Sequence, residues 1–323
     1  MLTYKTAGVD LENSNKLTSM ILKNAIENDG FAGVFELPLF KDYCLVSSTD
    51  GIGTKIEPLF KRKMYKQAAV DLIAMNFNDI AALGAKPLFF LDYIAVNKLD
   101  PDIISKFIIC LKDELQKYDC SLLGGETSEL NNLLYENSID ISGFVVGILK
   151  KENILKKENI KENDVLIALK SSGAHSNGFS LLRELDKKGL INIDDYLEPT
   201  RIYIKEVSTL AEEKKIISAA NITGGGIIDN LKRIIPKDLF VSIDENKIKK
   251  DENFIRLENI LGKPECYRTF NMGIGFILVC NKDDVDYVLD KTKKFDSYIL
   301  GKIVKNNGYK ETVDICFGQG DKL

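Results

Sequence analysis

The chain has 323 residues, of which 45% are hydrophobic and 28% are charged. This balance is typical of a folded globular protein and excludes a mostly disordered chain, and the length suits about two domains. The formal net charge of −4 disfavours a general affinity for the phosphate backbone of nucleic acid, although a local basic pocket is compatible with it.

The cysteines and the apolar segments restrict the class of protein further. The six cysteines include no C-x-x-C pair, which disfavours a structural zinc site or a disulfide framework and suits a reducing compartment. The longest apolar runs, Pro87–Val96 and Gly273–Cys280, reach about half the length of a membrane span. The segment 1–10 lacks the basic start and apolar stretch of a signal peptide. We therefore expect a cytoplasmic protein with no membrane partner and no nucleic-acid partner.

The first half of the chain predicts alternating strands and helices. Tyr43–Ser48 is rich in β-forming residues and is followed by a predicted turn at Thr49–Gly51. Gln67–Gly84 has apolar residues at helical spacing, and a glycine followed by a nearby proline marks its end. Beyond this helix the pattern predicts a strand at Leu88–Val96, a helix at Ile103–Lys117, and strands at Cys120–Leu123 and Ile139–Leu149.

A charged segment separates this half from a second α/β set. The segment 150–163, KKENILKKENIKEN, is predicted to be a boundary, although a solvated helix face is an equal alternative. After it the sequence predicts helices at Phe179–Lys188 and from the glycine turn at 222–226 through Arg233, and strands at Val165–Leu169, Leu239–Ile243, Gly275–Cys280, Tyr298–Val304 and Thr312–Phe317. The prediction is an α/β (α+β) protein of two domains, residues 1–162 and 163–323.

Polar residues follow the first predicted strand in the segment Ser47–Lys55, SSTDGIGTK. Gly51 and Gly53 allow backbone N–H groups to converge on an anion, and the ammonium of Lys55 neutralises it. Asp50 supplies a carboxylate of the kind that Mg²⁺ prefers. The spacing does not match the G-x-x-x-x-G-K-[ST] phosphate loop. An ordinary β-turn with exposed Asp and Lys side chains is therefore the alternative interpretation.

The predicted helix at 67–84 carries a polar edge within an otherwise apolar pattern. Asn78 stands two turns after Asp71, and Asp79 lies on the adjoining edge. A solvated face would also carry Lys or Glu, and this stretch carries neither. Asp71 alone is also explained as a cap or a partner of the helix dipole.

Another acid follows a predicted strand in the segment Gly124–Ser128, GGETS. The two glycines allow the backbone to approach a ligand closely. If Glu126 meets Asp50 and Asp79 in space, the three carboxylates repel one another unless cations are bound. Divalent cations that accompany ATP relieve this repulsion, so we predict a magnesium site formed by these three acids.

The second half offers two turns that suit an anion. Ser171–Gly178, SSGAHSNG, lies between a predicted strand and a predicted helix and contains His175, the only histidine of the chain. That histidine suits phosphate binding, proton transfer or a purely structural role. Thr223–Gly226 repeats the arrangement before another helix, and helix starts present free N–H groups. Arg201 and Arg268 add guanidinium groups suited to a phosphate ester, with surface ion pairs as the alternative.

A set of segments from Tyr4 to Val279 carries a resemblance to a known family. In chain order they are YKTAGVD, FAGVFELP, SSTDGIGTK, DLIAMNFNDIAALGAKPLFFLDYIA, LLGGETSEL, SSGAHSNGFSLLREL, EPTRIYIK, NITGGG and RTFNMGIGFILV. Together they closely resemble the phosphoribosylformylglycinamidine cyclo-ligases, also called aminoimidazole ribonucleotide synthetases. The wider superfamily includes formylglycinamidine ribonucleotide synthetase, selenophosphate synthetase, thiamine monophosphate kinase and a hydrogenase maturation factor.

The resemblance implies a fold, an assembly and a reaction. The N-terminal domain binds ATP and Mg²⁺ and pairs with its counterpart across a dimer axis into a β-barrel, and the C-terminal domain, a sheet flanked by helices, binds the substrate. A homodimer also hides the edge strands. The formyl amide oxygen of the ribonucleotide substrate is phosphorylated by ATP, the amidine nitrogen attacks that carbon, and phosphate leaves. The products are 5-aminoimidazole ribonucleotide, ADP and phosphate, in de novo purine biosynthesis.

The residue roles that we expect follow by motif. The nucleotide set is Gly51, Gly53, Thr54, Lys55, Asp71, Asn78, Asp79, Gly124, Gly125 and Thr127, and the metal set is Asp50, Asp79 and Glu126. The catalytic set is Asp50, Lys55 and His175. The substrate set is Ser171, Ser172, His175, Ser176, Asn177, Arg201, Thr223, Gly224, Gly225, Arg268 and Asn271.

Departures from the family pattern and rival functions also follow from the residues. Thr6 and Asn221 stand where the family usually has Asp and His, and Asn131–Tyr135 replaces a loop that usually contains Pro and Gly. Another phosphotransferase of the superfamily is the main rival, but the segments FELP, HSNG and FNMGIG favour the cyclo-ligase. Selenophosphate synthetases present a reactive residue near the N-terminus, and no cysteine precedes Cys44 here. A non-catalytic nucleotide-binding scaffold is disfavoured because the acids and Lys55 are all present.

Overall fold

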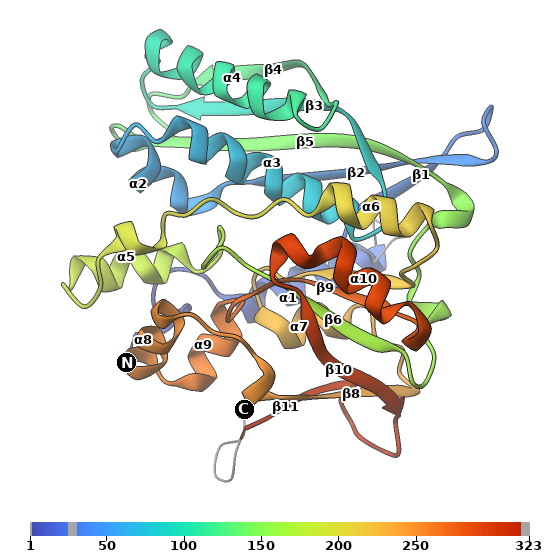
Figure 1. Ribbon diagram of the computed structural model, residues 1–323. Coiled ribbons are helices and arrows are strands. Elements are labelled where there is room, and N and C mark those ends of the chain that lie inside the picture. The colour runs from blue at the N-terminus through green and yellow to red at the C-terminus, as the bar shows by residue number, and fades with distance from the viewer. Residues whose placement is uncertain (1, 25–30, 318–323) are drawn as a thin grey trace.

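The computed structural model describes residues 2–24 and 31–317, which form two β-sheets, one from each half of the chain (Figure 1). The first sheet has the strand order β1-β2-β5-β3-β4 and consists of β1 (Gly33–Glu36), β2 (Tyr43–Gly51), β3 (Lys86–Val96), β4 (Ser121–Glu129) and β5 (Ile139–Lys150). The second has the order β11-β8-β10-β6-β9-β7 and consists of β6 (Val165–Lys170), β7 (Ser218–Asn221), β8 (Leu239–Asp244), β9 (Ile274–Cys280), β10 (Tyr298–Lys305) and β11 (Val313–Cys316). The predicted α/β class is confirmed.

The helices lie around and between these sheets (Figure 1). They are α1 (Leu11–Asn24), α2 (Ile56–Lys61), α3 (Tyr65–Ala81), α4 (Pro101–Gln116), α5 (Phe179–Lys187), α6 (Ile204–Glu212), α7 (Gly226–Lys232), α8 (Glu252–Leu261), α9 (Lys263–Thr269) and α10 (Val285–Thr292). In the part of the chain that the structure describes, no helix is long and apolar enough to cross a membrane.

Helix α3 is the main element that covers the first sheet. It packs across β2 and β5 and against α4, and most of its side chains are buried, including Leu72, Phe77 and Ile80. Helix α4 begins where Asp100 accepts hydrogen bonds from the backbone N–H groups of the following turn, with a proline at its first position. The other side of α3 contacts α6, so this helix lies between the two halves of the chain.

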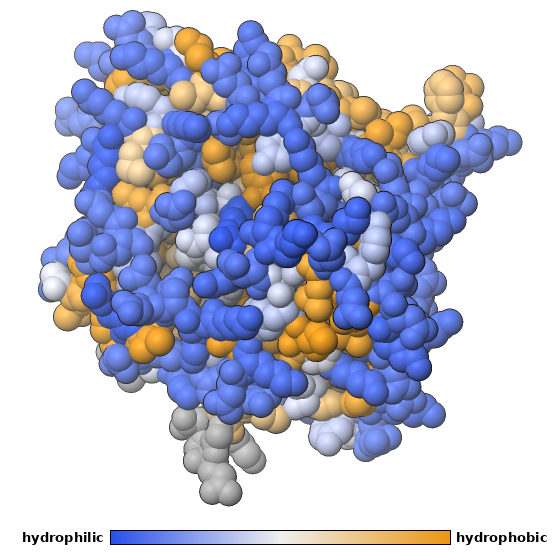
Figure 2. All heavy atoms as spheres, viewed as in Figure 1, coloured by the Kyte–Doolittle hydropathy of each residue, from blue (hydrophilic) through white to orange (hydrophobic). Residues whose placement is uncertain are grey.

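The opposite face of the first sheet is not covered by any described element. Paired residues on neighbouring strands point to the same face, and this face carries Phe35, Tyr93 and Phe144, all exposed. The β1–β2 hairpin projects from the body with hydrophobic atoms on its surface (Figures 1 and 2), and Leu39 and Phe40 there are 89% and 65% exposed. An apolar sheet face left open in this way is typical of an interaction surface.

Two strands are longer than the sequence indicates. The predicted turn at Thr49–Gly51 is wrong, because β2 continues to Gly51 and pairs with β5 through Ser142. The segment Gly124–Glu126 also lies inside a strand, because β4 continues to Glu129 along β3. Pairing with the neighbouring strands overrides the low β-propensity of Gly and Asp in β2 and of Gly and Glu in β4.

The charged segment at 150–163 forms two short 3₁₀ turns, Lys151–Asn153 and Lys157–Asn159. Its apolar residues Leu155 and Ile160 are buried, and the backbone of Leu155 bonds to Leu83. This segment is therefore packed against both halves of the chain. The domain bounds that we place within it stay a prediction.

Candidate functional site

Two carboxylates meet between α3 and the end of β2. Asp79 accepts hydrogen bonds from Ser48 Oγ at 3.1 Å and from Asn221 Nδ2 at 2.9 Å. Asp50 lies two residues after Ser48, on the same face of β2. Its carboxylate accepts the backbone N–H of Gly51 at 2.7 Å. Asn221, the residue that departs from the family pattern, thus connects β7 of the second half to this acid.

Helix α3 also fixes the backbone that carries Asp50. Asn76 Oδ1 accepts the N–H of Asp50, and Asn76 Nδ2 donates to its carbonyl oxygen, both at 3.1 Å. Asn76 is fully buried, and its amide therefore makes a ladder-like pair with the strand. This contact stabilises the polar end of β2 in the strand conformation.

The electrostatics of this pair favour a bound cation. Burial, together with the nearby charge of Asp50, raises the pKa of Asp79 to about 7, against the lowering effect of its bonds from Asn221 and Ser48. Burial also raises the pKa of Asp50. Neither acid forms an ion pair with a described residue. A divalent cation would stabilise both charged forms, so the chemistry of these donors fits Mg²⁺.

A further acid on this face of the sheet, Asp92, is not predicted from the sequence. Asp50, Gly143, Asp92 and Gly125 form one row across β2, β5, β3 and β4, so the Asp92 side chain points to the same face as that of Asp50. Asp92 is buried, which raises its pKa to about 6. A Cβ at Gly125 would collide with its carboxylate. The available signal is a single acid that interrupts the apolar run of β3.

The structure does not bring Glu126 to this pair within one chain. Glu126 belongs to the next row, with Gly51, Ser142 and Tyr93, and therefore points to the open face of the sheet. It is exposed and accepts a bond from Ser128 Oγ at 3.3 Å. Over residues 2–24 and 31–317, no group of three or more His, Cys, Asp or Glu side chains lies close enough to hold a metal ion. The predicted three-acid metal set therefore stays a prediction.

Lys55, Asp71 and Asn78 lie in the interior between the two halves. The side chains of Lys55 and Asp71 are fully buried and form an ion pair at 2.8 Å. Asn78 is buried as well and bonds to the backbone of Arg201 and Tyr203. Asp71 is seven positions into α3, so it is not the cap of that helix. These three residues face the second half of the chain rather than an open surface.

The turn at 171–178 is held by internal hydrogen bonds. Ser171 Oγ donates to Asn271 Oδ1 at 3.2 Å, and Asn271 Nδ2 donates to the carbonyl of Gly173. His175 is buried, and its Nε2 accepts the N–H of Ser172 at 3.3 Å. Burial, with the nearby cations Lys55 and Arg201, lowers the pKa of His175 to about 3. Its imidazole is therefore neutral near pH 7, which suits a positioning role better than proton donation.

The glycine turn at 223–226 lies beside the first turn. A Cβ at Gly224 would stand 3.7 Å from Asn177 Oδ1, which is ordinary contact distance. Thr223 Oγ1 donates to the buried Asn230, whose amide donates to the carbonyl of Gly226 at 2.8 Å. The two predicted anion turns are thus neighbours in space.

The two predicted arginines differ in placement. Arg201 is near the first turn and donates to the carbonyl of Lys170 at 3.0 Å. Arg268 is half exposed, 3.5 Å from Glu12 of α1. The N-terminal segment also reaches the turn through Tyr4, whose hydroxyl oxygen accepts the N–H of Gly178 at 3.4 Å.

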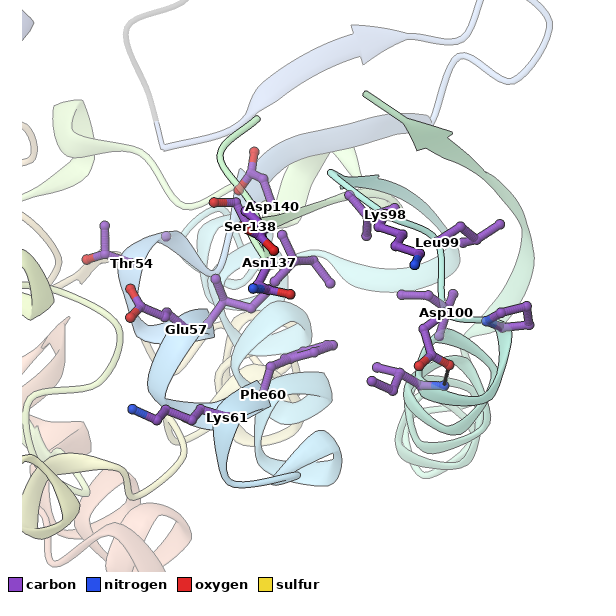
Figure 3. Close-up of a pocket in the computed structure, with 18 of the residues that line it drawn as sticks. Thr54, Glu57, Phe60, Lys61, Lys98, Leu99, Asp100, Asn137, Ser138 and Asp140 are labelled. Atoms are coloured by element: carbon purple, nitrogen blue, oxygen red, sulfur yellow. Dashed lines mark hydrogen bonds between the residues drawn. The ribbon is translucent and has the colours of Figure 1, made fainter. Parts of the chain in front are cut away.

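A cavity of about 1150 Å³ opens where β2 leads into α2. Figure 3 shows Glu57, Phe60 and Lys61 of α2 on one side and Asp100 at the start of α4 on the other. The remaining lining residues include Gly53, Thr54, Val96, Ile104, Ile139 and Arg183. Of the predicted nucleotide set, Gly53 and Thr54 reach this space.

Comparisons with known proteins agree with the resemblance seen in the sequence. Residues 31–149 match the family described as AIR synthase related protein, N-terminal domain, and residues 161–314 match its C-terminal domain. Solved structures with 17–18% identity share the fold. They include AaThiL complexed with AMPPCP and TMP, with a TM-score of 0.68 over 93% of this chain and 92% of that one. Hydrogenase maturation protein HypE in complex with ATP has a TM-score of 0.67 over 98% and 94%.

Several relatives in sequence share one name. Phosphoribosylformylglycinamidine cyclo-ligase of Thermoanaerobacter pseudethanolicus is 39% identical, over 95% of this chain and 99% of the relative. The protein of the same name from Clostridium perfringens is 40% identical over 91% and 94%, and that from Prochlorococcus marinus is 39% identical over 95% and 96%. The chain therefore belongs to the phosphoribosylformylglycinamidine cyclo-ligase family.

Proposed function

We propose that this protein closes the imidazole ring of 5-aminoimidazole ribonucleotide, using ATP and formylglycinamidine ribonucleotide, in de novo purine biosynthesis in the cytoplasm. The observation that carries the proposal is full-length similarity to enzymes of that name, together with retention of the paired buried acids Asp50 and Asp79. The alternative of a non-catalytic scaffold does not explain why these acids are kept in a place that disfavours their charge.

The reaction balances with ATP as the only co-substrate. The formyl oxygen attacks the γ-phosphorus, and ADP leaves. The amidine nitrogen then attacks the activated carbon, and phosphate leaves with the oxygen. Two protons leave the nitrogens, one of them carried away as hydrogen phosphate, and one proton shifts from the ring CH₂ to the exocyclic nitrogen to give the aromatic amine. The protein contributes mainly by holding the reacting ends together, which is worth about 7–11 kcal/mol at best.

The acids would hold magnesium at the phosphates of ATP. When bound, Mg²⁺ neutralises charge that develops between the β- and γ-phosphates. Asp50 and Asp79 are the proposed ligands, and Asp92 supports the same face of the sheet from two strands away. Gly51 and Ile52 donate their backbone N–H groups within the protein, so the N–H groups proposed for the phosphates are those of Gly53 and Thr54. Because Gly53 lies three residues after Asp50, within about 10 Å of chain, we assign the cavity beyond it to the rest of the nucleotide.

The neighbouring turns of the second half would hold the ribonucleotide. Their hydroxyls, backbone N–H groups and Arg201 suit a ribose phosphate. His175 serves this turn as a positioning residue, since its imidazole is buried, neutral and bonded to Ser172. Arg268, which is exposed beside α1, would close over the ligand from the side of the N-terminal segment.

We further propose a homodimer through the open face of the first sheet. Phe35, Tyr93 and Phe144 on that face would be buried against the partner, and joining the two sheets gives a barrel. Glu126 lies on this face and would reach the metal site of the assembled dimer. In the dimer, Glu126 would then serve a metal site that it does not reach within its own chain.

A direct assay tests the function. The purified protein is given formylglycinamidine ribonucleotide and ATP with Mg²⁺, and ADP and aminoimidazole ribonucleotide are measured together. We expect equal amounts of both, and a loss of at least about a hundredfold in kcat for Asp50→Asn. ATP binding without substrate-dependent turnover would instead support the scaffold, and ADP formation without the imidazole product would indicate another phosphotransferase.

A further inference from the structure

Lys55 has no hydrogen-bonding capacity left for a ligand. Its Nζ lies 2.7 Å from the carbonyl oxygen of Glu198, 2.9 Å from that of His175, and 2.8 and 3.1 Å from the two carboxylate oxygens of Asp71. An ammonium has three N–H donors, and three groups accept them here. The ring of Phe179 lies 5.2 Å from Nζ and adds to the enclosure.

Asp71 also accepts hydrogen bonds from the segment 198–203, which contributes the Glu198 carbonyl to Lys55. Its Oδ1 accepts the backbone N–H of Thr200 at 2.8 Å and the hydroxyl of Thr200 at 2.6 Å. Two helical turns later, Asn78 Oδ1 accepts the N–H of Tyr203, and its Nδ2 donates to the carbonyl of Arg201. Residues seven apart on a helix are nearly aligned, so α3 binds the segment 198–203 along one edge.

That segment in turn holds the polar turn at 171–178. Ser172 Oγ donates to the carbonyl of Pro199 at 2.6 Å, and the hydroxyls of Ser176 and Thr200 are 3.2 Å apart. The hydroxyl of Tyr203 donates to the carbonyl of Lys170 at 3.0 Å, directly before the turn. Lys55 bonds to the turn itself through the carbonyl of His175. The turn is therefore connected to α3 through Lys55 and the segment 198–203, from its start to Ser176.

The same helix carries one acid of the pair on its adjoining edge and holds the strand that carries the other. Asn76 holds the backbone of Asp50, and Asp79 is the second acid. From Asp71 to Asp79 the helix rises about 12 Å. One rigid element thus sets the separation between the acids and the polar turn.

We propose that Lys55 and Asp71 are positioning residues that fasten the ribonucleotide-binding turn to α3, and that Lys55 does not contact a phosphate of ATP. The expected change in the KM for the ribonucleotide rests on the function proposed above. The expected loss of order in the turn at 171–178 does not. A buried ion pair of this kind adds little net stability over an apolar replacement, so its main effect is on geometry.

The test compares three single variants with the native protein. Lys55→Met removes the ammonium, and Thr200→Val removes the hydroxyl that bonds to Asp71 from the opposite half of the chain. Lys250→Met is the matched control, because Lys250 forms a mostly buried ion pair with Glu245 at 2.9 Å and a second one with Glu258, among residues that the proposed site does not use. The double variant Lys55→Met/Asp71→Leu leaves no unpaired charge and serves if Lys55→Met fails to fold.

Two readouts are measured on each variant. Hydrogen exchange of the amides at 171–178 needs no activity, and we expect it to quicken about tenfold or more in Lys55→Met and in Thr200→Val but not in the control. In steady-state kinetics we expect the KM for the ribonucleotide to rise about tenfold while the KM for ATP changes less than about threefold.

The outcomes separate the possible roles. A rise confined to the KM for ATP in Lys55→Met, with native behaviour in Thr200→Val, places Lys55 on ATP and overturns the proposal. Unchanged exchange at 171–178 in every folded variant also overturns it. If the native protein itself lacks turnover, the proposed function fails, and the exchange data still decide whether the turn is fastened by Lys55 and Asp71.

Discussion

Asp79 shows how one residue can be costly to the fold and useful to the site. Its carboxyl is buried between Ser48 and Asn221, and its pKa is raised to about 7. The ordinary value in an unfolded chain is 3.8. Between these two values the folded state binds the proton more tightly than the unfolded state does, so stability falls as the pH rises from about 4 to 7. Above that range the cost of the buried charge is fully present.

The variant Asp79→Asn should therefore be more stable than the native protein at pH 8, by a few kcal/mol at most, and no more stable at pH 4. Thermal unfolding at the two pH values checks this, with the exposed Asp290→Asn as the control that changes Tm little at either pH. Added Mg²⁺ should raise Tm at pH 8 in the native protein but not in Asp79→Asn. Equal Tm values for Asp79→Asn and the native protein at pH 8 would contradict the assigned environment.

At the scale of single residues, the sequence points to candidate acids but does not show their hydrogen-bond partners. Asp50 and Asp79 were found from polar residues that interrupt apolar patterns. Asp92 is not predicted because a single acid within an apolar strand belongs to no recognisable motif, and its position beside the row of Asp50 follows only from strand register. The sequence predicts that Lys55 neutralises an anion, and it does not show the contacts of Lys55 with Asp71 and two backbone carbonyls, because these come from distant segments.

At the scale of elements, the long apolar runs were predicted well. The helix at 67–84 and the strands at 88–96 and 139–149 correspond to α3, β3 and β5 within a few residues. Local propensity failed at the ends of β2 and β4, where glycine and acidic residues are held in strands by pairing. Short elements with weak periodicity, such as β7 and α9, were not predicted.

The turn before α7 offers a test of backbone geometry. Gly226 has φ +65°, and a Cβ there would collide with the carbonyl of Tyr267. Gly308 has φ +97° with nothing near its Cβ position, so Gly308→Ala measures the backbone strain alone, about 1 kcal/mol. We expect Gly226→Ala to lose clearly more, about 3 kcal/mol, and to raise the KM for the ribonucleotide. Chemical denaturation of both variants checks the comparison, and equal losses would show that the crowding at Gly226 is relieved at no cost.

At the scale of the whole molecule, the open face of the first sheet is the feature that the sequence alone did not reveal. Alternating exposure along β3 and β5 leaves Tyr93 and Phe144 in water in the single chain. Only the assembled sheet shows that these residues share a face with Phe35. The sequence predicted a dimer through resemblance, and the sheet shows which surface is available for it.

A charge on that face should prevent the assembly. We expect Tyr93→Glu to be a folded monomer with little activity, because a carboxylate would be buried without a partner. Leu190→Glu, at a half-exposed position of the second half, is the control and should leave the dimer intact. Light scattering after size-exclusion chromatography distinguishes the two states, and a dimeric, active Tyr93→Glu protein would rule out this face.

Because Glu126 and Asp79 lie on opposite faces of one sheet, a centre that needs both would draw them from different chains. Asp79→Asn and Glu126→Gln would then each be inactive alone, yet subunit exchange between them would restore one working centre in every mixed pair. Random exchange of equal amounts predicts recovery to about a quarter of native turnover. Complementation of this kind would mean that neither polypeptide owns a complete catalytic apparatus. A complete active site would then exist only in the dimer.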